Sequence, residues 1–159
     1  MFIATYEGLR STGHYYLKST APRTPKSPEV SKEVQDVSPH FVTILSQAAA
    51  AESFGLDQVA GVGYRKALEF IIKDFCIAEH EHESDAIKGM FLGQVIDKYV
   101  DSGNIKSCAK LASWLGNDET HYVRRWEDKD ISDLKTLLKL TEGWIRDHLL
   151  TRKYLGEMQ

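Results

Sequence analysis

The chain has 159 residues, of which 42% are hydrophobic and 27% charged, and its formal net charge is -3. These values are typical of one globular domain with its own core, and they exclude a disordered or fibrous chain. The acidic balance argues against strong nonspecific binding to nucleic acid. Because no secretory signal or long apolar run is visible, we expect no membrane association and a cytoplasmic location.

The first twenty residues differ in composition from the rest of the chain. Phe2–Tyr6 and His14–Lys18 are aromatic and β-branched, and Glu7–Gly13 between them has the composition of a loop. This pattern predicts two short strands joined as a hairpin. An isolated hairpin is only marginally stable, so we expect it to pack on the rest of the chain or on a second subunit.

Three of the four prolines, Pro22, Pro25 and Pro28, lie within seven residues of one another. Their spacing predicts an extended linker that acts as a spacer, with a ligand for a proline-recognition domain as the alternative. We therefore divide the chain into a hairpin and linker, residues 1–27, and a helical bundle, residues 28–159.

Helical patterns begin after this linker. Ser27-Pro28 predicts a short helix to about Asp36, because a hydroxyl before proline is a common helix start. Ser38-Pro39 predicts a second helix through Phe54, ended by Gly55. Its expected buried face contains Phe41, Ile44, Leu45, Ala48 and Ala51.

The next helix is expected to begin at a cap formed by Asp57. Gly61 and Gly63 disfavour a helix, so we expect them to face the Ala-rich helix at short range. Arg65 and Glu69 have (i, i+4) spacing, which is typical of a surface ion pair. The apolar residues at helical spacing are Val59, Val62, Leu68, Ile71, Ile72 and Phe75.

A polar break follows at Glu79–Asp85. His80 and His82 stand there among carboxylates, but their spacing fits no tetrahedral metal template, so we interpret the segment as a solvated loop. Asp101–Asn104 is interpreted as a turn. One helix before this turn carries Met90, Phe91, Val95, Ile96 and Tyr99, and one after it carries Ile105, Cys108, Leu111, Ala112 and Leu115.

The last helix is long and is expected to begin at the cap Asp130, with Asp133 in its first turn. Trp144 is expected to widen its buried stripe, and basic residues gather toward its C-terminal end. That stripe contains Ile131, Leu134, Leu137, Leu138, Thr141, Ile145 and Leu149. The whole pattern predicts a mainly α fold, a helical bundle of about four to six helices with a short N-terminal β-hairpin.

The most informative polar segment is Leu115–His121. Asn117 and His121 have (i, i+4) spacing, so on a helix their side chains can meet a common ligand. Gly116 before them permits close approach of backbone or ligand. The structural alternative is that the pair bridges a loop to neighbouring helices and holds the last two helices together.

Other catalytic patterns are missing from the sequence. There is no phosphate loop, dinucleotide fingerprint or nucleophile elbow, and no metal or cofactor is predicted. Cys76 and Cys108 lie among apolar residues and are interpreted as buried thiols.

A chemical role can still be assigned to the polar segment. His121 can act as a general acid or base, and Asn117 can orient it or hold a phosphate or ribose oxygen. Arg124 or Arg125 can neutralise a phosphate. The candidate binding residues are Arg65, Glu69, Asp118, Arg124 and Arg125.

Four features occur in order along the chain: the proline-rich lead-in, the Ala-rich helix, Gly63–Glu69 and Leu115–His121. The last two are similar to the "R-R-A-L-E" helix and the "L-G-N-x-x-x-H" segment of the bacterial domain-of-unknown-function family 4145. On these features the chain resembles that family from Pro25 to about Leu149. The resemblance implies a helical domain distantly similar to the HEPN superfamily.

Many HEPN domains are metal-independent ribonucleases of toxin–antitoxin, restriction and phage-defence systems, and they often dimerise so that two Arg–His motifs face one cleft. By this resemblance, Asn117 and His121 match the Asn and His of the motif. Gly116 stands where the ribonuclease motif has its Arg. Arg65 is the candidate to supply this charge from the neighbouring helix, oriented by Glu69.

Three hypotheses about function follow. The first is a noncatalytic interaction or nucleic-acid-associated module, a homodimer, in a defence or restriction context; it fits Gly116 and the acidic composition. The second is a metal-independent HEPN-type endoribonuclease acting on RNA, with His121 catalytic and Asn117 supporting it. The third is a nucleotide or small-molecule sensor that uses the same cleft.

Overall fold

The computed structural model describes residues 3–8, 13–21, 25, 27–118 and 130–158. Within these residues a two-stranded antiparallel sheet is followed by seven α-helices, which confirms the mainly α fold with an N-terminal hairpin. The helices outnumber the four to six expected, and two of them are short. The elements are β1 (Ile3–Gly8), β2 (Tyr15–Ala21), α1 (Lys32–Val37), α2 (Pro39–Ser53), α3 (Asp57–Glu79), the 3-10 helix η1 (Glu81–Glu83), α4 (Ser84–Gly89), α5 (Leu92–Tyr99), α6 (Gly103–Asp118) and α7 (Ile131–Glu157).

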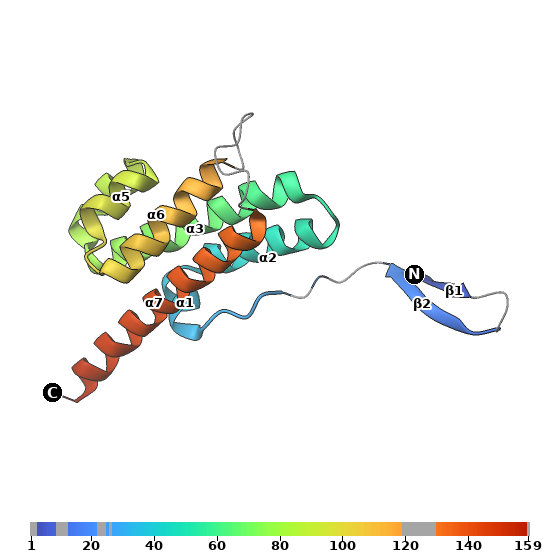
Figure 1. Cartoon of the computed structure of the whole chain (residues 1–159). Coiled ribbons are helices and arrows are strands. Elements are labelled where there is room, and N and C mark those ends of the chain that lie inside the picture. Colours follow the sequence, from blue (N-terminus) through green and yellow to red (C-terminus); the bar gives the residue numbers. More distant parts are fainter. Residues whose placement is uncertain (1–2, 9–12, 22–24, 26, 119–129, 159) are drawn as a thin grey trace.

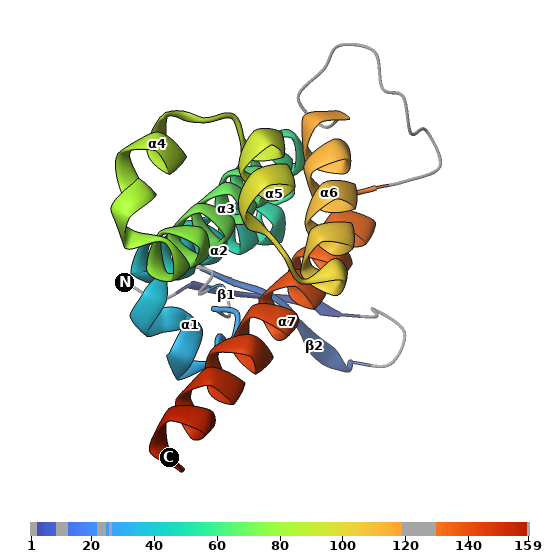
Figure 2. The same ribbon diagram turned by 90° about the vertical axis from the view of Figure 1, so that its left-hand side faces the viewer.

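Helix α3 is the centre of the bundle and packs against α2, α5, α6 and α7 (Figures 1 and 2). Leu68 and Ile72 are fully buried, as predicted. Val59 and Val62 were expected in the core, but they are 61% and 47% exposed. They lie in the first turns of α3, near the end of the bundle where α2 is its neighbour (Figure 1), so helical spacing alone misplaced them.

The closest helix contact joins α2 to α3. A Cβ atom built on Gly63 would lie 2.8 Å from the Cβ of Ala48, so only glycine fits at this crossing. This confirms that Gly63 faces the Ala-rich helix. Gly55 has a φ of 73° in the turn between the two helices, which explains why α2 ends where the sequence predicts.

Three predicted helix starts are wrong in detail. Helix α1 begins at Lys32 with Ser31 as its N-cap, and not at Ser27-Pro28. Pro39 does open α2, but the fully buried hydroxyl of Ser38 donates to Oδ2 of Asp74 on α3, at 2.5 Å, and does not cap the helix. The hydroxyl that the local sequence predicts as a helix cap therefore makes a tertiary hydrogen bond instead. The predicted cap of α3 is also displaced, because Asp57 lies in the first turn of this helix and Leu56 is the N-cap residue.

The segment between α3 and α6 contains more short helices than the sequence predicts. Part of the predicted polar loop is helical, as η1 and the start of α4. The chain then turns at Met90 and Phe91, which precede α5, and Phe91 is 83% exposed. The single helix predicted here is thus two short helices.

The start of α7 follows the prediction. Oδ1 of Asp130 accepts hydrogen bonds from the backbone N–H groups of Ser132 at 2.7 Å and Asp133 at 3.3 Å, and Asp133 accepts one from the N–H of Asp130. The predicted stripe is confirmed at its centre, where Leu134, Leu138, Thr141, Ile145 and Leu149 are buried. Its other members, Ile131 and Leu137, are partly buried and pack against the core. Trp144 does not widen it, since its side chain is 40% exposed.

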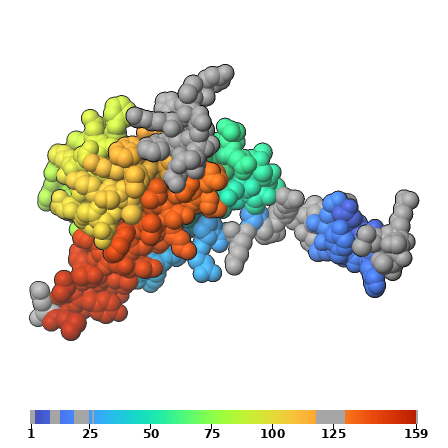
Figure 3. Space-filling model, viewed as in Figure 1, coloured from blue at the N-terminus to red at the C-terminus, as the bar shows by residue number. Residues whose placement is uncertain are grey.

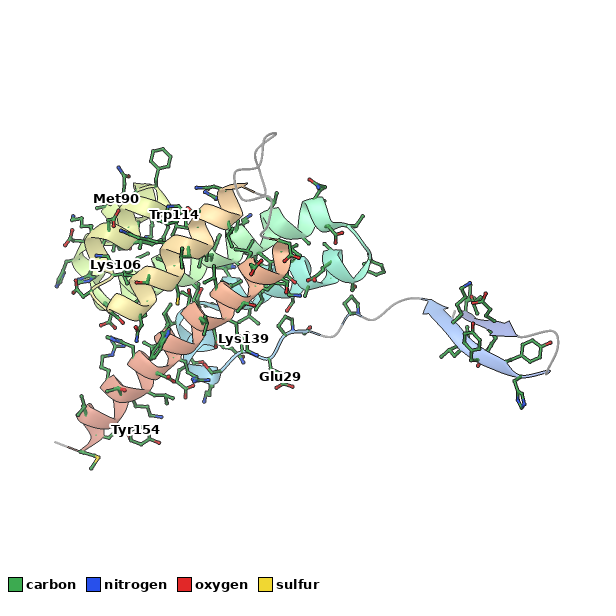
Figure 4. All side chains as sticks on the ribbon, in the orientation of Figure 1. Glu29, Met90, Lys106, Trp114, Lys139 and Tyr154 are labelled. Atoms are coloured by element: carbon green, nitrogen blue, oxygen red, sulfur yellow. The ribbon has the colours of Figure 1, made fainter. Side chains whose placement is uncertain are left out.

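The last two turns of α7 extend beyond the other helices (Figure 1), and Tyr154 lies on this extension (Figure 4). Every side chain from Thr151 to Met158 is exposed. Glu79 at the end of α3 pairs with Arg152 and with His148, the latter at 3.3 Å. These contacts hold α7 to α3 just before it leaves the bundle.

The hairpin stands away from the helices (Figures 1 and 3). Its strands are longer than predicted, because Glu7 and Gly8 belong to β1 and not to the loop. Side chains from Ile3 to Glu7 and from His14 to Lys18 are exposed. Among the residues that the structure describes, none of the helices combines the length and apolar character needed to cross a membrane.

Candidate functional site

Arg65 of α3 and Asn117 of α6 meet where these two helices cross. The Nε–H of Arg65 donates a hydrogen bond of 2.7 Å to Oδ1 of Asn117, although the residues are 52 positions apart. This hydrogen bond fixes the orientation of the whole guanidinium group, because the group is planar and its N–H donors keep a fixed geometry. The tertiary structure therefore brings together two of the residues that the sequence singled out.

Gly116 makes this contact possible. A Cβ atom at position 116 would lie 2.8 Å from Cγ and 2.9 Å from Cβ of Arg65. Real Cβ atoms do not approach other carbons so closely, so any other residue would push the arginine stem away. The stem of Arg65 from α3 thus fills the space beside Gly116.

Glu69 lies one helical turn beyond Arg65 and is shared by two cations. Its Oε2 is 3.8 Å from Nη1 of Arg65, and its Oε1 is 2.8 Å from Nζ of Lys73. The predicted Arg65–Glu69 pair is present, but Lys73 is the closer partner. Since these side chains are partly exposed, each pair adds only a few tenths of a kcal/mol, about 0.3–0.5.

A hollow of about 450 Å³ opens beside this arrangement. The Nζ of Lys66 lies 6.0 Å from the centre of the Phe70 ring, and His40 of α2 meets the same ring edge-on at 5.9 Å. The hollow thus combines an aromatic wall with cations. It is lined by Val62, Arg65, Lys66, Glu69 and Phe70.

Several predicted site residues lie outside the described residues. These are His121, Arg124 and Arg125, and the side chain of Asp118 is likewise not described. Helix α6 is described to Asp118, so the predicted common face of Asn117 and His121 stays a prediction.

A larger cavity of about 510 Å³ lies between α2, α3, α7 and the segment before α1. Apolar and charged side chains line it together, and Glu29 and Lys139, labelled in Figure 4, are among the charged ones. Sequence reasoning did not find this cavity, because its walls come from four distant segments. It is lined by Ser27, Pro28, Glu29, Val30, Phe41, Leu45, Tyr64, Lys135, Leu138, Lys139 and Glu142.

Charged groups beside this cavity are internally paired. The Tyr64 hydroxyl donates to Oε2 of Glu52 at 2.5 Å, and Nζ of Lys135 donates to Oε1 at 2.8 Å. Burial and the Glu52 carboxylate raise the pKa of Tyr64. Burial opposes ionisation of Glu52, but the hydrogen bonds from Lys135 and Tyr64 and the Lys135 charge outweigh it and lower its pKa.

The thiols give no sign of nucleophilic chemistry. Cys76 is fully buried, and burial together with the Glu79 and Asp101 carboxylates raises its pKa to about 12. Cys108 is only partly buried, contrary to expectation, and burial raises its pKa too. The structure, over the residues it describes, places no three His, Cys, Asp or Glu side chains where they could hold a metal.

Sequence reasoning missed Lys73, Lys66 and Phe70 at the candidate site. Lys73 stands four residues after Glu69, so helical spacing was a usable signal. The contact between Gly116 and Arg65 had no such signal, because it depends on how α6 crosses α3.

Comparison with protein-family models, with curated proteins and with solved structures found no match.

Proposed function

We propose that this chain is a noncatalytic helical interaction module that works as a homodimer. The observation that supports it is the hairpin, which stands away from the bundle with its side chains exposed, Tyr6 at 60%, Tyr15 at 75% and Leu17 at 53%. Apolar surface gathered on a small element typically marks an interaction site. A two-stranded hairpin also needs a packing partner to be stable.

The geometry of Arg65 argues for a structural and not a catalytic role. Its Nε–H is bonded to Asn117, its Nη1 lies near Glu69, and its stem packs on Gly116. A guanidinium that joins two helices in this way contributes to packing and register. The resemblance to family 4145 agrees with a helical domain of this kind, and it suggests a role beside defence or restriction components.

Light scattering on the purified chain at micromolar concentration tests the homodimer. We expect the mass of two chains, and a monomer throughout that range would contradict this part of the proposal. Incubation with mixed RNA, with and without EDTA, tests the absence of catalysis. We expect intact RNA in both samples.

A metal-independent endoribonuclease is the second candidate, and one observation favours it. Arg65 supplies a cation directly beside Gly116, where the ribonuclease motif has its Arg, and it contacts Asn117 at 2.7 Å. His121 would then act as the general base and acid, and the guanidinium would stabilise the charge that develops on the phosphate.

The same RNA assay separates the two candidates. Cleavage that resists EDTA and disappears in His121→Ala and Arg65→Gln would establish the ribonuclease. Circular dichroism of both variants must match that of the natural chain, so that lost activity is not lost folding. Intact RNA with a folded protein leaves the noncatalytic module as the function.

A further inference from the structure

The two faces of the hairpin differ in chemistry. Tyr6 pairs with Leu17 and Gly8 with Tyr15, so these residues share one face of the two-stranded sheet. The ring of Tyr15 lies across Gly8, where a Cβ atom would be 2.5 Å from two ring carbons. We call Tyr6, Tyr15 and Leu17 the tyrosine face.

The opposite face carries Glu7 and Tyr16, with Ile3 farther along the same side of β1. Glu7 pairs with Tyr16, accepts a hydrogen bond of 3.3 Å from its hydroxyl, and forms an ion pair of 3.1 Å with Lys18. The Glu7 face therefore holds the polar contacts of the hairpin, and the tyrosine face is the more apolar of the two.

The bundle carries an exposed apolar surface of its own around the turn from α2 to α3. Phe54, Leu56, Val59 and Val62 are 49%, 53%, 61% and 47% exposed. We call these four residues the turn patch. Leu56, Val59 and Val62 follow one another at intervals of three, so they lie along one side of the start of α3.

The turn patch runs into the hollow of about 450 Å³, because Val62 belongs to both. A hollow of this size accepts an aromatic ring. Arg65, Lys66 and Glu69 line it as well, so donors and an acceptor are present for a phenol hydroxyl. Its lining, which combines Val62 and Phe70 with charged groups, suits the ring and the hydroxyl of a tyrosine side chain.

The linker favours docking on another molecule. Pro22, Pro25 and Pro28 lie between the hairpin and the bundle, a composition that predicts a spacer. The bundle begins at Val30, which packs against the core. The described strands lie apart from the helices of their own chain, as Figures 1 and 3 show, which leaves the hairpin surface open to a second copy.

We infer that two copies of the chain exchange hairpins, the tyrosine face of each docking on the turn patch of the other. Two-fold symmetry makes the exchange reciprocal, so one closed dimer contains two identical contacts. In each contact a tyrosine face covers a turn patch. The inference rests on the proposed homodimer and names the surfaces that form it. The Glu7 face of each hairpin then remains in water.

Matched variants test each surface. Tyr15→Ser and Tyr16→Ser remove the same side chain from neighbouring positions on opposite faces. Leu56→Ser and Leu140→Ser remove leucines that are 53% and 47% exposed, one inside and one outside the turn patch. In sedimentation velocity, we expect Tyr15→Ser and Leu56→Ser to weaken dimerisation at least tenfold, and the two controls to dimerise as the natural chain does.

Mixing provides a second measurement that is independent of folding defects. A Tyr15→Ser chain keeps an unaltered turn patch, and a Leu56→Ser chain keeps an unaltered tyrosine face. A dimer of one chain of each kind therefore regains one of the two docking contacts. We expect the mixture to associate more strongly than either variant alone. A natural dimer that Tyr15→Ser and Tyr16→Ser leave equally intact would overturn hairpin exchange but not the homodimer. A natural chain that stays monomeric would overturn both.

Discussion

Gly116 leaves no room for a Cβ atom beside the stem of Arg65, and this predicts the free-energy cost of adding one methyl group. Gly116→Ala places a Cβ 2.8 Å from Cγ of Arg65. Gly143→Ala is the control, since a Cβ there meets nothing within 4 Å. Relative to this control, we expect Gly116→Ala to lose about 1–3 kcal/mol of unfolding free energy.

Urea unfolding of the two variants measures this difference. Alanine favours a helix over glycine by about 1 kcal/mol, and this gain is common to both variants, so the comparison isolates the clash. Equal stability of the two variants would show that Arg65 moves aside at no cost.

A second residue-scale prediction concerns Glu142 at the rim of the larger cavity. Burial raises its pKa above the ordinary 4.5, outweighing the Ser31 backbone hydrogen bond and the Arg146 and Lys139 charges. The folded chain therefore binds the proton more tightly than the unfolded chain. The resulting stabilisation is complete below pH 4.5 and is lost as the pH rises through the folded pKa.

Glu142→Gln removes this titration. We expect the unfolding free energy of the natural chain, relative to the variant, to increase as the pH falls from neutral toward 4.5. Urea unfolding of both proteins across that range measures the trend. A natural chain that gains relative stability as the pH rises would contradict the raised pKa.

At the scale of single elements, the start of α7 depends on one side chain. Asp130 accepts hydrogen bonds from two backbone N–H groups that have no partner within the helix. Asp130→Ala is expected to lower the unfolding free energy by about 0.5–2 kcal/mol. Asp130→Asn is the control, because an Asn side chain caps equally well. Thermal unfolding compares them, and equal losses in both variants would contradict a capping role.

At the scale of the whole molecule, residues 28–159 should fold without the hairpin. The core and the residues packed against it begin at Val30, and they include none from the hairpin. Where the chain is monomeric, we expect deletion of residues 1–27 to change the unfolding free energy by about 0.5 kcal/mol or less. A chain that starts at Lys32 also loses Val30 and the Ser31 cap, and it should be measurably less stable.

Urea unfolding followed by circular dichroism compares the three lengths. Loss of helical signal in the 28–159 chain would show that the hairpin supports the bundle directly. The predicted domain boundary between residues 27 and 28 would then be wrong.

Elements whose signals lie within a few residues were predictable from the sequence. The capping box at Asp130, the glycine at position 55 and the apolar stripe of α7 each act within a few residues, so their outcome could be read from spacing. The same reasoning recovered Gly63 against the Ala-rich helix, since a helix tolerates glycine where a neighbour leaves no room for a side chain.

Features that depend on how the helices cross were not predictable from local spacing. Val59 and Val62 have core spacing but lie where no described helix covers them, and Ser38 caps nothing because Asp74 of α3 takes its hydroxyl. Gly116 and Arg65 are far apart in sequence, and their contact exists only because α6 crosses α3 at that point. Local spacing specifies a helix and its apolar side, whereas the partner that each side meets is set by the packing of the whole chain.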